Sequence, residues 1–341
     1  MSIMPSLRIP SIRISPENST VLDQLGLLQD LAGNWHGRGF NLIARPDREG
    51  GGPLFLELNQ THETLKFDPI SSSIPNRGFA QDDIELFGLT YLQKISDAVT
   101  GGALHIEPGI WVTQPATTAP PETPDAGTQI VARMATIPHG NALLAQGMAL
   151  DVPNLTGGTF TINPINTSPF GAGSSMPVGG TQGGFPPYDL SNTTPAAVNF
   201  RTPFGDTPPI PLPDSISTVP MQTVINDPTR LLQQAIQGQF IEKMVVLNIA
   251  TVASLDVTSG AVPINFGAGG IENMPFLETN ADAAVVFATF WLETIQHPSG
   301  TGHFQQLQYV QTVILNFPIL GTTTNLSWPH VSVATLRKTF G

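Results

Sequence analysis

Apolar and polar residues alternate with a period of two along much of this chain, the pattern of half-buried β-strands. Turn-forming clusters rich in Gly, Pro, Asp and Asn separate these segments. The alternating or short apolar segments are 35–44, 54–59, 62–68, 85–97, 103–113, 129–138, 142–150, 242–256, 283–296, 304–317 and 327–338. The pattern predicts an all-β protein in which one antiparallel barrel removes the exposed strand edges.

Two stretches have the spacing of helices instead. In residues 19–33, leucines recur every three residues between Ser19, a candidate N-cap, and Gly33, a candidate stop. Residues 227–240 open with an Asp-Pro pair, which suits the N-cap and first position of a helix. A short helix is therefore expected before the first strand and another before the later strands.

The middle of the chain differs in composition from both flanks. It is dense in Pro, Gly, Ser, Thr and Asn, which does not support a regular core of its own. Its aromatic residues could anchor it to a barrel wall: Phe160, Phe170, Phe185, Tyr188, Phe200 and Phe204. We therefore divide the chain into an N-terminal arm, a first part of the barrel, an insertion wrapped on the barrel and a second part of the barrel, at residues 1–20, 21–150, 151–228 and 229–341.

Charge and composition exclude several classes of function. Charged residues are 12% of the chain, the net charge is −12 and the pI is about 4.8, which argues against nucleic acid and anionic membranes as partners. The absence of cysteine excludes disulfides and thiolate ligands. The apolar run 283–292 is far shorter than the ~20 residues of a membrane-spanning helix. With no apolar signal region near the N-terminus, we expect a cytoplasmic protein.

Common catalytic motifs are missing, so no catalytic residue is identified. The glycines of 265–270 lack the spacing of a dinucleotide-binding loop and predict an ordinary loop. His105 and Glu107 are two residues apart on a predicted strand and so share one face. If that face is the barrel interior, the two must be paired because burial of unpaired polar groups is costly; if it faces solvent, neither has a chemical role.

Histidines are the remaining candidates for chemistry. The seven in the chain form no closely spaced pair, so a multi-histidine metal site has little local support. Haem differs because one axial histidine suffices. His139 lies in a predicted turn between two strands, where a structural role or a place in a pocket are both open.

Four segments together resemble the nitrobindin-type members of the calycin barrels. They are "LAGNWHGRGF" (31–40), "LTYLQKISDAVTGGALHIEPGIWV" (89–112), "FQQLQYVQTVILNF" (304–317) and "LSWPHVSVATLRKTF" (326–340). The insertion 151–228 has no counterpart in a minimal barrel of this family.

The resemblance implies an antiparallel barrel of about ten strands that binds ferric haem b. By position, His330 would be the proximal iron ligand and His105 a second histidine of the pocket. Ser332, Ala334 and Leu336 alternate with His330 and would share its face. Trp35 would close the barrel floor with Arg337 packed across its ring. The associated chemistry is reversible binding of NO and isomerisation of peroxynitrite.

Two other functions remain open. A haem-free barrel would carry a lipophilic small molecule, such as a fatty acid or isoprenoid, in its apolar interior. Alternatively, the insertion is a contact surface for a protein partner, through proline-rich stretches such as 207–214. The sequence leaves the oligomeric state open, with a homodimer among the options.

Overall fold

The computed structural model describes residues 18–48, 52–174, 188, 199–201, 212–252, 269–318, 321–322 and 325–339. Several predictions fall outside these ranges: nearly all of the arm 1–20, most of 207–214 and 265–270, and the side chains of Phe185, Phe200 and Phe204.

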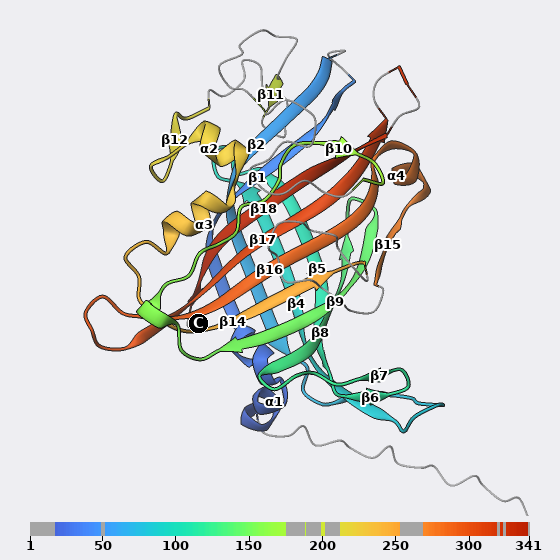
Figure 1. Ribbon diagram of the computed structural model, residues 1–341, viewed down its shortest axis with the longest axis vertical. Coiled ribbons are helices and arrows are strands. Elements are labelled where there is room, and N and C mark those ends of the chain that lie inside the picture. Colours follow the sequence, from blue (N-terminus) through green and yellow to red (C-terminus); the bar gives the residue numbers. More distant parts are fainter. Residues whose placement is uncertain are drawn as a thin grey trace, which may run out of the picture.

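Ten long strands close into one antiparallel barrel (Figure 1). Neighbours around the barrel are β2, β1, β18, β17, β16, β14, β9, β8, β5 and β4, and the pairing of β4 with β2 closes the ring. The strands are β1 (Gly33–Asp47), β2 (Gly52–Pro69), β4 (Ile84–Asp97), β5 (Ala103–Gln114), β8 (Thr128–Ile137), β9 (Asn141–Val152), β14 (Ile241–Ala250), β16 (Asp282–Gln296), β17 (His303–Pro318) and β18 (Asn325–Thr339). The predicted fold class is confirmed.

Short elements decorate this barrel. The additional strands are β3 (Ile74–Asn76), β6 (Thr117–Thr118), β7 (Pro121–Glu122), β10 (Phe170–Gly171), β11 (Asn199–Arg201), β12 (Ser215–Ile216), β13 (Val219–Pro220) and β15 (Gly270–Asn273). The helices are α1 (Asn18–Gln24), η1 (Gly26–Leu31), η2 (Thr156–Gly158), α2 (Met221–Asn226), α3 (Thr229–Ala235) and α4 (Pro275–Asn280), where η marks a 3-10 helix. Within the described part of the chain, none has the length and apolar character needed to cross a bilayer.

The structure corrects several predicted boundaries. The two strands expected at 54–59 and 62–68 are one strand, β2, whose polar residues Asn59 and Thr61 point inward and are buried. Because these inward positions are polar, the apolar alternation is interrupted there and the sequence pattern indicated two strands. The first predicted helix breaks at Gly26, whose φ of 55° lies in the left-handed region. The second shortens to α3, while α2 and α4 were not predicted.

Two apolar cores lie on opposite sides of the barrel wall. Inside the barrel, Trp35 packs with Leu28 and Leu31 of η1, and the indole Nε1–H donates to the Leu31 carbonyl oxygen at 2.7 Å. Outside, the outward-facing Phe40 of β1 belongs to the same cluster as Leu232 of α3. The N-terminal helices thus plug one end of the barrel, while α2 and α3 cover part of its flank (Figure 1).

The predicted packing of Arg337 across Trp35 is wrong. Inward positions on β18 are even-numbered, so Lys338 reaches the indole, with its Nζ 5.3 Å from the ring centroid. Arg337 points outward, and its guanidinium carbon lies 4.5 Å from the centroid of Phe304. A cation does cover the tryptophan, but the strict alternation of the strand selects the neighbouring residue.

Candidate ligand-binding cavity

A cavity of about 550 Å³ occupies the barrel interior away from the plugged end. This volume lies within the range of small-molecule sites, ~300–1,000 Å³. The walls are inward-facing residues of the barrel strands, joined by residues of β15 and α4. Its polar lining is Asn41, Glu57, Gln93, His105, His139, Asn141, Tyr309, Gln311, His330 and Ser332.

His330 lies on the inner face of β18 and lines this cavity. Its Nε2 is 2.9 Å from the carbonyl oxygen of Ala44 on β1. Because a carbonyl only accepts, Nε2 carries the hydrogen and Nδ1 keeps its lone pair. Burial lowers the pKa of His330 to about 4, against the opposing effect of this hydrogen bond, so the imidazole is neutral at pH 7.

The other predicted pocket residues of β18 divide between two environments. Ser332 lines the cavity together with His330. Ala334 and Leu336 also face inward, but they are fully buried in the inner apolar core with Trp35 and do not line the cavity. The four residues share the inward face, as alternation requires, but only His330 and Ser332 are available to a ligand in this cavity.

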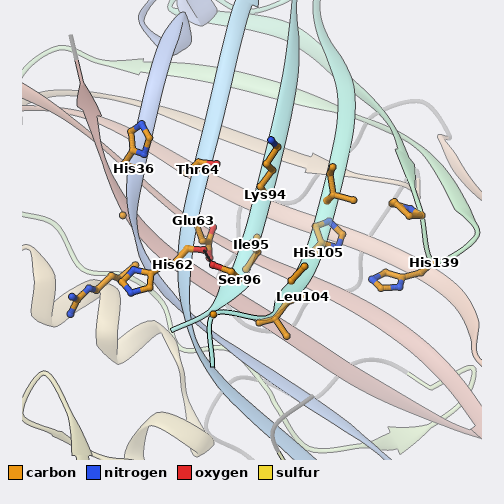
Figure 2. A pocket seen from close by; sticks show the side chains of 16 residues that line it. His36, His62, Glu63, Thr64, Lys94, Ile95, Ser96, Leu104, His105 and His139 are labelled. Carbon is orange, nitrogen blue, oxygen red and sulfur yellow. Dashed lines mark hydrogen bonds between the residues drawn. The ribbon is translucent and has the colours of Figure 1, made fainter. Parts of the chain in front are cut away.

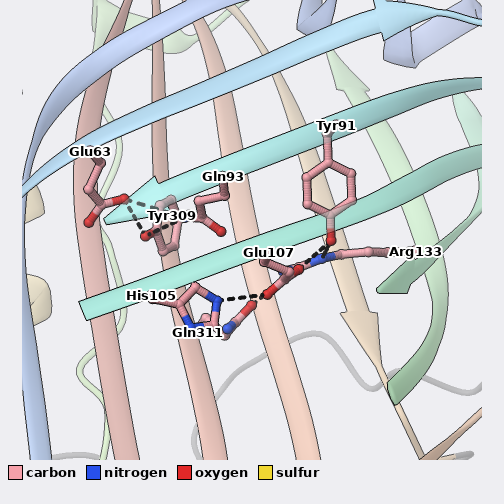
Figure 3. Close-up of polar contacts among 8 residues, drawn as sticks. All are labelled: Glu63, Tyr91, Gln93, His105, Glu107, Arg133, Tyr309 and Gln311. Atoms are coloured by element: carbon pink, nitrogen blue, oxygen red, sulfur yellow. Dashed lines mark hydrogen bonds and ion pairs between the residues drawn. The ribbon is translucent and has the colours of Figure 1, made fainter. Parts of the chain in front are cut away.

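The interior polar cluster of β5 and β8 is built around Glu107 (Figure 3). Its carboxylate forms an ion pair with Arg133, accepts from Tyr91 and lies 3.2 Å from Nε2 of His105. Burial alone would raise the pKa of Glu107, but the Arg133 charge and the bonds from His105 and Tyr91 lower it to about 2. Glu107 is therefore ionised, and it fixes the ring of His105 at the cavity wall.

Arg133 connects this cluster to the opposite side of the barrel. It is 2% exposed, its Nε donates to the Tyr91 hydroxyl at 2.8 Å, and a terminal nitrogen donates to Gln311 on β17 at 2.7 Å. Because Gln311 lines the cavity, the ion pair lies just beneath it. The pairing also explains how two charged groups are tolerated inside the barrel.

A second carboxyl cluster lies between β2, β4 and β17 (Figure 3). Glu63 is 2% exposed and accepts hydrogen bonds from the Tyr309 hydroxyl at 2.6 Å, from Thr61 at 2.8 Å and from Gln93 at 3.4 Å. Burial raises the pKa of Glu63, and these neutral donors offset that effect in part. Unlike Glu107, Glu63 is held without a guanidinium.

His139 and Glu57 stand at the rim of the cavity. His139, in the turn between β8 and β9, has its ring centroid 5.7 Å from that of His105. Partial burial, and then the nearby His105, lower the pKa of His139. Burial raises the pKa of Glu57 on β2, against the opposing charge of Arg45.

The structure brings together His330, His105, Ser332 and His139. It confirms that His105 and Glu107 share a face, and of the two alternatives left open this face is the barrel interior. Sequence reasoning missed Tyr91, Gln93, Arg133, Tyr309 and Gln311. Each occupies an inward position of β4, β8 or β17, among apolar inward residues of the same strand such as Leu89, Val131 and Leu307. A polar residue interrupting the apolar half of an alternating strand was the signal for them.

Comparisons with known proteins add little to this geometry. No protein-family profile matches the chain, and no curated protein matches it significantly. Among solved structures, the chain is similar to the crystal structure of Rv2717c from M. tuberculosis, with 12% sequence identity and a TM-score of 0.38. That match covers 92% of this chain and 98% of the other.

Proposed function

We propose that the barrel is a small-molecule-binding protein whose cavity holds haem, with His330 as the iron ligand. The observation that carries the proposal is the state of His330: a neutral imidazole lining a cavity, with one ring nitrogen anchored and the other holding a lone pair. Histidines that bind metals usually donate their second N–H to a carbonyl or carboxylate in this manner.

The rest of the site is compatible with haem, whose porphyrin supplies most of the ligands of its iron. No group of three or more His, Cys, Asp or Glu side chains in the described residues could hold a metal ion directly. Haem iron takes a single proximal histidine from the protein, so this observation fits haem better than a bare ion. Ser332, next to His330 on the inner face, is small and leaves space in front of the ring.

Bound haem would supply the binding and redox chemistry of iron towards NO, peroxynitrite or a related small oxidant. The chain's own residues would set the environment. His330 holds and orients the group, the apolar wall limits access of water, and Glu107 keeps His105 at a fixed orientation on the cavity wall.

Titration with haemin tests the proposal. Wild-type protein should show saturable, one-to-one binding with a Soret band, and His330→Ala should shift that band or abolish it. His297→Ala is the matched control, because His297 lies exposed in the turn after β16 and should leave the spectrum unchanged. Absence of saturable binding in the wild type would overturn the haem assignment. With haem bound, the rate of peroxynitrite decay is the next measurement.

A haem-free lipophilic carrier is the second candidate, and the apolar wall of the cavity favours it. That wall includes Ile43, Ile95, Leu143, Ile271, Val313 and Leu315. A fatty acid or isoprenoid would contact these residues without needing the imidazole. Purified protein would then carry extractable lipid detectable by mass spectrometry, and His330→Ala would retain it.

A further inference from the structure

The outer face of the barrel carries a hollow of about 820 Å³ beside the cavity rim. It lies over β1, β2, β4 and β5 and ends at the turn that holds His139 (Figure 2). The hollow shares a few rim residues with the interior cavity, among them Leu104 and His139. Most of its polar lining, however, belongs to outward-facing positions that the interior site does not use.

Strand register arranges this polar lining as two rows of three residues. In the first row, His36 of β1 is opposite Thr64 of β2, which is opposite Lys94 of β4. Directly opposed side chains on neighbouring strands have Cβ atoms ~5 Å apart, so each row forms one continuous surface.

The second row lies two residues further along the strands. Here Arg38 of β1 is opposite His62 of β2, which is opposite Ser96 of β4. All six residues of the two rows carry hydrogen-bond donors, and four of them have basic side chains.

This grouping of basic residues has no acidic counterpart in the hollow. The one carboxyl residue of the lining, Glu63, points to the barrel interior, where Tyr309 and Thr61 donate to it. On the outer face, Arg38 stands directly opposite His62, an arrangement that gives no favourable pairing between strands. A concentration of basic side chains with no acidic partner in the hollow, on a chain of net charge −12, points to an anionic ligand.

The opposite side of the hollow is apolar. Ile106 of β5 is directly opposite Lys94 and is 42% exposed, and Leu104 and Pro138 continue the same wall. A ligand that fills the hollow would therefore meet cationic donors at one end and aliphatic surface at the other.

We propose that this hollow binds a small organic anion, with a phosphate or carboxylate head on the donor rows and an apolar body against Ile106 and Leu104. The donor rows of this site lie on the outer face of the barrel, so the site meets the proposed haem site only at shared rim residues such as Leu104. Arg38 and Lys94 supply the charge-assisted hydrogen bonds, while Thr64 supplies a neutral one.

Calorimetric titration of the whole protein at low ionic strength tests this site. The probes are methyl phosphate, hexyl phosphate and hexanoate, which compare the head alone, the head with an apolar body, and a carboxylate head with a similar body. Hexyl phosphate or hexanoate should bind saturably, and hexyl phosphate should bind roughly tenfold more tightly than methyl phosphate because its chain is partly buried.

Variants locate the binding. Arg38→Gln and Lys94→Gln should each weaken binding roughly tenfold, as expected for loss of a charged hydrogen bond. Lys66→Gln is the matched control: Lys66 faces outward on β2 but is paired with Asp68 at 2.8 Å, so its loss should change affinity less than about twofold. Ile106→Ser should weaken hexyl phosphate and leave methyl phosphate unchanged.

Several results would overturn the proposal. Equal weakening by Lys66→Gln would indicate diffuse charge attraction, and no response to Arg38→Gln or Lys94→Gln would place the anion elsewhere, including the barrel cavity. Equal affinity for methyl and hexyl phosphate would remove the apolar half of the site. Absence of saturable binding for all three probes would remove the site altogether.

Discussion

The two ends of the barrel are built from the same strands, but one end is filled by a packed apolar core and the other contains a cavity. At the plugged end, β18 contributes Ala334 and Leu336 to a core that also holds Trp35, and all three are fully buried. Toward the other end, the same inner face of β18 presents Ser332 and His330 to a cavity. The alternation of β18 continues without a break from one region to the other. The regions differ because one is filled with apolar side chains and the other is not.

A layer of buried polar groups separates these regions. Arg133 and Glu107 on one side, and Glu63 and Tyr309 on the other, form hydrogen-bonded clusters inside the barrel. Such clusters do not add much stability compared with apolar packing, but they impose directional requirements that an apolar core lacks. The apolar packing that stabilises the barrel therefore lies at the plugged end, and the cavity lies at the other end.

Trp35→Ala should have the largest effect on stability. The substitution removes a fully buried indole and its hydrogen bond to Leu31, so the free energy of unfolding should fall by about 3–5 kcal/mol. Urea denaturation followed by circular dichroism measures this. A loss below about 1 kcal/mol would show that the plugged end is not the main source of stability.

Arg133→Met should cost about 3 kcal/mol, because it leaves the Glu107 carboxylate buried without its cation. The double variant Arg133→Met/Glu107→Leu should recover most of that loss, since no buried charge remains. Denaturation of the two variants and the wild type under one set of conditions completes the test. Equal stability of single and double variants would contradict the role assigned to the ion pair.

Glu293 of β16 is buried beside the outer apolar core, and it should make the stability of the protein depend on pH. Burial raises the pKa of Glu293 to about 8, although Gln306 donates to it at 2.7 Å and favours the charged form. The folded state therefore holds a proton that the unfolded chain releases near pH 4.5. Stability should fall as pH rises from about 4.5 to 8, by about 2 kcal/mol between pH 6 and 8.

The Glu293→Gln variant isolates this contribution. It keeps a neutral, hydrogen-bonding side chain of similar shape, so its stability should lack the decline that the wild type shows between pH 6 and 8. Denaturant midpoints of both proteins across that window make the comparison. Parallel pH profiles would show that Glu293 is not protonated in the folded protein.

Ser332→Ile should have the smallest effect on stability, within about 1 kcal/mol, because the cavity has room for the larger side chain. The same change should obstruct any ligand held beside His330, whether haem or lipid. Thermal unfolding and haemin titration of one preparation separate the two effects. A strongly destabilised variant would mean that this end is packed as tightly as the other.

Much of the fold could be predicted from the sequence because alternation is a local property. Strands such as β1, β5 and β17 were located to within a few residues. The spacing of His105 and Glu107 placed them on one face, and the structure showed that this face is the barrel interior. Two expectations were wrong. Polar inward residues made β2 look like two strands, and the family resemblance placed Arg337 over Trp35, whereas the alternation of β18 places Lys338 there.

The sequence by itself determined the class of fold and which residues of a strand share one face, since both depend on periodicity along a single strand. The places of Trp35 at the barrel floor and His330 in the pocket were implied by the family resemblance. Only the tertiary structure decided the partners. Arg133 reaches Glu107 from a neighbouring strand and Gln311 from across the barrel, and His330 is anchored by a carbonyl on β1. These contacts join residues far apart in the chain, and their geometry exists only once barrel closure and register have been set.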